Sequence, residues 1–245
     1  TGVIVSAVIF STYVSLGGLW GTAVTNLIHC GVVLLGLLSV GLIGIGQFGG
    51  WTGVTEAIHQ QLAMTSHNEI AWWGFVGAGW LPVFAMIFSA AIHTPAASVY
   101  TNYAAAAHNE RLIPSAFIVA GIIAAIMPLL AGLIGVLTTA QYGVDAGLGG
   151  YRNLTMLASD ISPVVGGIAL AAVLAAVISS GGPILLSSVT MFVRDWLPFT
   201  EHYDETRKLR TYQVTTIVYA FVAAALAWLV ATKTDISILD LLLFG

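Results

Sequence analysis

The chain has 245 residues, of which 58% are hydrophobic and only 7% are charged, and its formal net charge is −4. Soluble domains carry about 25% charged residues, so this chain lacks the polar shell that a water-soluble fold needs. Its weak negative charge and the absence of a Lys/Arg run exclude a nucleic-acid partner. The single Cys30 excludes a disulfide framework or a thiolate metal site. Composition therefore predicts a protein whose partner is membrane lipid.

Apolar runs long enough to cross a bilayer recur along the chain. A spanning helix needs about 20 mostly apolar residues, and its backbone must be hydrogen-bonded internally, so every span is predicted to be helical. The expected fold is an all-α, polytopic membrane protein with about five full and two partial transmembrane helices. In chain order these are a partial helix at 2–15, full spans at 19–46, 71–92, 113–139, 164–193 and 211–231, and a second partial helix starting at 237.

Polar segments separate the spans and are predicted to be loops, at 51–70, 93–112, 140–163 and 194–210. Two of them, 93–112 and 194–210, carry most of the basic residues, and the positive-inside rule places both in the cytoplasm. We expect a multi-pass protein of the cell membrane. Both ends of the chain lie in apolar runs and there is no initiator Met, so residues 1–245 are expected to be a single transmembrane domain that is a fragment of a longer protein.

The span at 164–193 carries the most informative pattern of polar groups. Ser179 and Ser180 lie near its middle, and Ala176 precedes them by three and four residues, which puts its carbonyl on the same helix face. Hydroxyl and carbonyl oxygens of this kind can replace part of the water shell of a sodium ion. Pro183 removes one backbone donor and frees the carbonyl of Ser179. Serine pairs in membrane helices also bond back to the helix or line helix contacts, and the residues alone leave both interpretations open.

A second group of polar residues lies where the predicted partial helix gives way to the next span. Gly17 and Gly18 predict a turn, and Thr25, Asn26 and His29 follow near the start of the next helix. Polar residues inside membrane helices are functional candidates. Solvation at a helix end explains them equally well.

Together, these two stretches resemble the sodium:solute symporter family, which includes the sodium/proline and sodium/sugar transporters. The first family signature is a Tyr, then Gly-Gly four and five residues later, then Thr-Asp, then a Gln. The second is Ala-Ala, two apolar residues, a Ser-Ser pair and an Asp sixteen residues after the first Ser. The matching positions here are Tyr13, Gly17, Gly18 and Thr25, and then Ala175, Ala176, Ser179, Ser180 and Asp195.

The chain departs from the family pattern at three places. Asn26 stands where the family usually has the Asp, and His29 stands where it has the Gln. The usual Gln-Arg after core helix 6 is replaced by Val99–Tyr100. The first departure removes a carboxylate from the expected ion exit path, which puts ion release in doubt more than ion binding.

The resemblance implies an inverted-repeat fold of five plus five helices, with ions and solute bound at mid-membrane. It implies that the chain runs from the end of core helix 4 to the start of core helix 10. It also implies a sodium site formed by the Ala176 carbonyl and the Ser179 and Ser180 hydroxyls, facing core helix 1. Thr25 and Asn26 would lie on the ion exit path.

Solute contacts are expected on core helix 6, the predicted span 71–92. This span contains a Gly/Pro cluster, and either that cluster or the segment His93–Thr94–Pro95 is expected to break the helix. Close helix packing is the alternative explanation for the glycines. A half-helix end near mid-membrane exposes backbone groups to a solute. The expected substrate-facing residues are Phe88, Ser89 and His93.

The resulting prediction is a secondary active transporter that couples sodium to the symport of a small-molecule solute by alternating access. Two alternatives stay open: a transporter-like sensor module of a signalling protein, and a proton-coupled or uncoupled carrier of the same fold. An enzyme is not expected, because the spans contain no paired carboxylates and no His/Asp/Glu metal cluster. The sequence carries no signal of oligomeric state.

Overall fold

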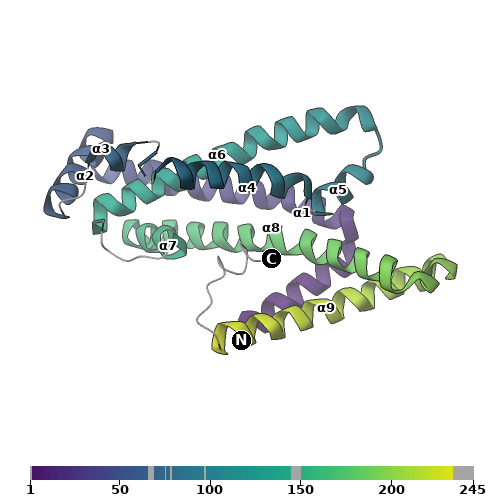
Figure 1. The fold of residues 1–245 in the computed structure, drawn as a ribbon. Helices are drawn as coiled ribbons and strands as arrows, with labels where there is room; N and C mark the ends of the chain where they lie inside the picture. The colour runs from purple at the N-terminus through teal and green to yellow at the C-terminus, as the bar shows by residue number, and fades with distance from the viewer. Residues whose placement is uncertain are drawn as a thin grey trace. The chain divides into compact units, whose positions relative to one another are not determined.

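The computed structural model describes residues 2–65, 69–74, 76–77, 79–96, 98–144 and 150–233, and every regular element among them is helical (Figure 1). This confirms the predicted all-α class. The elements are α1 (Gly2–Gln47), α2 (Trp51–Thr65), α3 (Glu69–Trp73), α4 (Trp80–Ala96), α5 (Ser98–Ala105), η1 (Glu110–Leu112), α6 (Ile113–Tyr142), α7 (Gly150–Ile161), α8 (Pro163–Trp196), η2 (Pro198–His202) and α9 (Glu205–Lys233).

Four helices of the described chain are long and apolar enough to cross a membrane. They cover Ile4–Gln47, Glu110–Tyr142, Pro163–Trp196 and Glu205–Val230, and a shorter apolar helix covers Trp80–Ser89. Three of the long helices confirm the predicted spans at 113–139, 164–193 and 211–231. The predicted partial helix beginning at 237 lies outside the described residues.

The chain divides into two compact units. Unit 1 combines residues 1–27 with residues 177–245, and unit 2 comprises residues 28–176. Helices α1 and α8 each contribute to both units.

Unit 1 contains the first half of α1, the second half of α8, and α9. The backbone of α1 leaves helical geometry at Gly18, with φ 52° and ψ −147°, a conformation that is essentially restricted to glycine. The predicted turn between two helices is thus confirmed, because α1 is two helices joined at Gly18.

Unit 2 has a hydrophobic core formed by α2, α6, α7 and the parts of α1 and α8 that belong to it. Its buried side chains include Val40, Val54, Ile58, Leu137 and Leu157. Each of these is at most 1% exposed. Within a membrane such residues act through close van der Waals packing and not through removal from water, so their fit fixes the helix arrangement inside the unit.

Two predicted loops are wrong. Residues 51–70 contain α2 and the start of α3, and residues 140–163 contain α7. Helix α2 buries Val54, Ile58 and Leu62, which recur every four residues and form one face of a helix. These helices are amphipathic and too polar to be detected as membrane spans. Corrections also apply to the other two predicted loops. Residues 93–112 contain the end of α4 together with α5 and η1, and residues 194–210 contain η2 and the start of α9.

The predicted span at 71–92 is broken, at one of the two positions where the sequence led us to expect a break. Helix α3 ends at Trp73, α4 begins at Trp80, and the described residues between them form turns. The turn hydrogen bonds include Gly77 N to Gly74 O at 3.0 Å and Gly79 N to Val76 O at 2.7 Å. The break therefore lies at the glycine cluster, and the backbone of α4 continues through residues 93–95 to Ala96.

Candidate functional site

The serine pair lies at the centre of α8. This helix has 34 residues, from Pro163 to Trp196, so Ser179 and Ser180 are equally far from its two ends. At 1.5 Å per residue, each half spans about 25 Å, which places the pair deep within a membrane-spanning segment. Ser179 is half-buried, whereas Ser180 and Ala176 are exposed. The three predicted sodium ligands thus lie along one stretch of helix, and two of the three residues are exposed.

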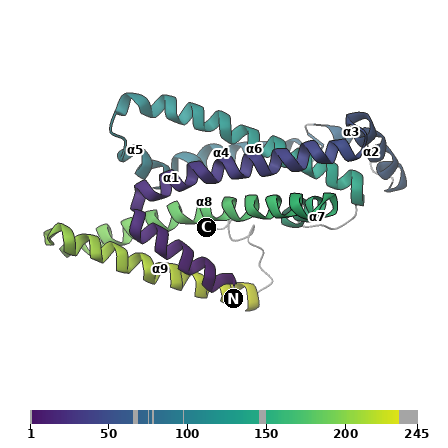
Figure 2. The same cartoon turned by 180° about the vertical axis from the view of Figure 1, so that it is seen from behind.

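Tyr13 of the first signature contacts the second signature directly. Its hydroxyl donates a hydrogen bond of 3.1 Å to the carbonyl oxygen of Ile178, the residue before the serine pair. Figure 2 shows the first half of α1 in the unit that also contains α9 and the second half of α8. The two sequence patterns, 165 residues apart at these two positions, therefore meet within unit 1.

The glycines after the serine pair make this contact possible. A Cβ atom on Gly182 would lie 1.7 Å from the Tyr13 hydroxyl oxygen, and one on Gly181 would lie 2.6 Å from ring atoms of Phe10. Neither distance is compatible with a real side chain. Glycine at both positions lets two aromatic side chains of α1 rest on the backbone of α8.

Pro183 does not interrupt α8. The helix continues through it to Trp196, although proline cannot supply the backbone donor that the Ser179 carbonyl would otherwise receive. The loss of one backbone donor at Pro183 is thus tolerated within a continuous helix.

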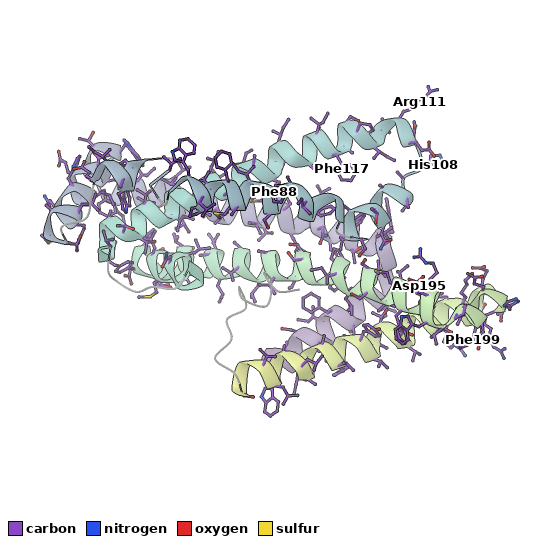
Figure 3. The ribbon with its side chains drawn as sticks, in the orientation of Figure 1. Phe88, His108, Arg111, Phe117, Asp195 and Phe199 are labelled. Carbon is purple, nitrogen blue, oxygen red and sulfur yellow. The ribbon has the colours of Figure 1, made fainter. Side chains whose placement is uncertain are left out.

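Asp195, the last residue of the second signature, lies near the end of α8. Its carboxylate accepts a hydrogen bond of 2.8 Å from Nε of the adjacent Arg194. Figure 3 shows Asp195 at this end of the helix, with Phe199 of η2 beyond it. The carboxylate is exposed and more than ten residues from the serines along α8, so it does not contribute to the ion site at the helix centre.

The two predicted exit-path residues, Thr25 and Asn26, differ in whether their side-chain oxygens make hydrogen bonds. The Thr25 hydroxyl donates back to the carbonyls of Gly21 at 2.8 Å and Thr22 at 3.1 Å. Asn26 Oδ1 is buried and accepts no hydrogen bond within the described residues, and the same holds for Nδ1 of His29. A buried unpaired polar atom costs about 1–3 kcal/mol, so Asn26 has capacity for a donor or a cation that Thr25 lacks.

The predicted solute contacts lie on α4. Phe88 is 68% exposed and Ser89 is exposed as well (Figure 3). The side chain of His93 lies outside the described residues, although its backbone belongs to α4. The role of Phe88 and Ser89 in solute binding stays a prediction.

Sequence reasoning placed Tyr13 in a signature but missed its contact with the ion-site helix. The residues around Tyr13 do not indicate that its hydroxyl is hydrogen-bonded to Ile178. The signal that could have found it is the Gly181–Gly182 pair, because two adjacent glycines inside an apolar helix indicate a close approach by another segment.

One of three comparisons with known proteins gave a match. The sequence profile of the sodium:solute symporter family matches residues 1–244, which is nearly the whole chain. A search of curated proteins and a search of solved structures gave no match. Members of this family are transporters and not enzymes, and their activity is coupled to sodium. On the match over residues 1–244, the chain belongs to the sodium:solute symporter family.

Proposed function

We propose that the chain carries out sodium-coupled symport of a small solute, with sodium held by the carbonyl of Ala176 and the hydroxyls of Ser179 and Ser180. The observation that carries this proposal is the position of the serine pair at the centre of a 34-residue apolar helix. Neutral hydroxyl and carbonyl oxygens suit a small hard cation. The exposed face of Ala176 and Ser180 leaves room for ligands from another helix.

We further propose that residues 1–245 form one transmembrane domain. The two halves of α1 correspond to the end of core helix 4 and to core helix 5, and α3 with α4 corresponds to a broken core helix 6. Helices α6, α8 and α9 are then core helices 7, 8 and 9. The remaining ligands for sodium would come from core helix 1, and the basic segments at 93–112 and 194–210 would face the cytoplasm.

The mechanism needs no covalent step. Sodium favours the state in which the solute site is open to the outside, solute then binds, and the loaded protein converts to a state open to the inside. Coupling is the difference in affinity that ion and solute have for these two states. The broken α3–α4 segment supports solute binding at this point, because helix ends within a membrane expose backbone groups that hold small polar solutes.

The experiment is uptake of a panel of labelled small solutes into proteoliposomes, with and without an imposed sodium gradient. The double variant Ser179→Ala/Ser180→Ala is expected to abolish the sodium dependence of uptake. A second serine pair on the same helix provides the control. Ser187 and Ser188 lie two turns further along α8, and the Ser188 hydroxyl is bonded back to the Ile184 carbonyl at 2.9 Å.

The variant Ser187→Ala/Ser188→Ala is expected to keep sodium-dependent uptake. Unchanged sodium dependence in the first double variant would refute the assignment of the ion site. A proton gradient imposed without sodium tests the alternative of a proton-coupled carrier, which is favoured by the neutral Asn26 in place of a carboxylate. Uptake driven by protons alone would replace sodium with protons in the proposal.

A further inference from the structure

We propose that Tyr13 is a positioning residue for the sodium-binding serines, and that Gln213 holds in place the helix segment on which Tyr13 lies. This inference rests on the proposed sodium site. Tyr13 acts through the backbone of α8, to which it is hydrogen-bonded one residue before Ser179.

The contact between Tyr13 and α8 is specific in position. The hydroxyl donates to the Ile178 carbonyl at 3.1 Å, and the missing side chain of Gly182 leaves the space that this hydroxyl fills. The Phe10 ring, three residues earlier on α1, lies over Gly181 in the same way. A shift of α8 by one residue, or its rotation about its axis, would bring a Cβ atom into one of these rings. The contact therefore fixes the rotation of α8 and with it the directions of Ser179 and Ser180.

The segment of α1 that carries Tyr13 ends at the break at Gly18. A break of this kind leaves carbonyls in the preceding turn without their usual backbone donors. Ser15 lies in that turn, and Nε2 of Gln213 on α9 donates a hydrogen bond of 3.2 Å to the Ser15 carbonyl. This bond ties the end of the segment to α9.

Two hydrogen bonds, two residues apart along the chain, thus hold the end of this segment of α1. Tyr13 joins it to α8 and Gln213 joins it to α9, and all three helices belong to unit 1 at these positions. A movement at Gly18 would release or reform both bonds together. Through these two bonds, a movement of the part of α1 that contains Asn26 would change the orientation of the ion-binding serines without a direct contact.

The test uses the full-length protein in detergent with sodium alone as the probe. Thermal unfolding is followed at increasing NaCl, with choline chloride holding the ionic strength constant. Tyr13→Phe removes the hydroxyl and keeps the ring over Gly182. It is expected to raise the NaCl concentration for half-maximal stabilisation about two- to tenfold, the change that corresponds to one lost hydrogen bond. Gln213→Leu is expected to shift it in the same direction by a smaller factor.

Tyr142→Phe is the matched control, because the Tyr142 hydroxyl also makes a tyrosine hydrogen bond, to Asp160 in unit 2. It is expected to lower the unfolding temperature without sodium and to leave the sodium midpoint unchanged. An unchanged midpoint in Tyr13→Phe, with stabilisation lost in Ser179→Ala/Ser180→Ala, would overturn the positioning role and leave the proposed function standing. Absence of sodium stabilisation in the wild-type protein would overturn both.

Discussion

Two segments of the chain place glycine and proline inside an apolar run, with opposite outcomes. In α8, Gly181, Gly182 and Pro183 follow one another, and the helix continues. Between Gly74 and Pro82 the same residue types end one helix and begin another. Composition alone therefore does not decide whether a membrane helix breaks.

The difference lies in how many helical bonds are lost and what packs against the glycines. In α8, Pro183 removes a single donor, and the glycines are in contact with Phe10 and Tyr13 of α1. Around Gly77 the backbone turns so closely that a Cβ atom there would lie 1.8 Å from the Ala71 carbonyl oxygen. Gly79 then adopts φ +95°, which stops helical propagation.

The largest expected effect is therefore at Gly77. Gly77→Ala places a methyl group against a backbone carbonyl, which cannot move without opening the turn. We expect a loss of about 3 kcal/mol in the free energy of unfolding, at the upper end of the cost of overpacking. Thermal and denaturant unfolding of the purified protein measures it.

Gly167→Ala in α8 is the control for that measurement, because a Cβ atom there has no neighbour within 4 Å. It is expected to stabilise the protein by about 0.5–1 kcal/mol through helix propensity. Equal stability of the two alanine variants would show that the close approach at Gly77 does not define the break.

An intermediate effect is expected at Gly182. The added methyl group of Gly182→Ala meets the end of the Tyr13 side chain, which can rotate away at the cost of its hydrogen bond. The expected loss is about 2 kcal/mol in the free energy of unfolding, less than at Gly77, where the obstacle is backbone. Calorimetry compares the two variants, and a larger loss at Gly182 than at Gly77 would reverse the comparison.

Pro183→Ala is expected to have a smaller effect, of opposite sign. Alanine restores the donor to the Ser179 carbonyl and removes a residue that costs about 3 kcal/mol in a regular helix. Because the neighbours of Pro183 are already adapted to it, we expect a gain of about 1 kcal/mol in stability. Thermal unfolding of the purified variant measures the gain, and a loss of stability would show that the backbone around Pro183 does not accept regular helical geometry.

The sequence made the long helices predictable because their physical cause is local. Runs of apolar residues produced α6, α8 and α9, and the Gly17–Gly18 pair marked the break in α1. The sequence also contains a pattern that indicates α2, a helix that lies in a segment predicted to be a loop. Val54, Ile58 and Leu62 repeat with helical spacing, but a search for spans overlooks an amphipathic helix whose other face is polar.

The candidate site was predictable only in part. The spacing of Ser179 and Ser180, read with the family resemblance, located a possible ion site on one helix. The bond from Tyr13 to Ile178 joins residues 165 positions apart, and no local pattern specifies it. It depends on the packing of α1 against α8, which only the folded chain shows. The same holds for the buried, unpaired Oδ1 of Asn26, which the sequence could only place near a helix end.

The smallest effect is expected at Pro82, which completes the comparison with Pro183. Pro82 is the third residue of α4, where the backbone N–H has no partner within the helix, so alanine adds no hydrogen bond. Pro82→Ala is expected to change the free energy of unfolding by less than about 0.5 kcal/mol, as for most exposed substitutions. Thermal unfolding of both proline variants in one detergent measures the contrast. A loss above about 1 kcal/mol at Pro82 would mean that the proline helps to fix the start of α4. The turn at Gly74–Gly79 would then not determine the start of this helix by itself.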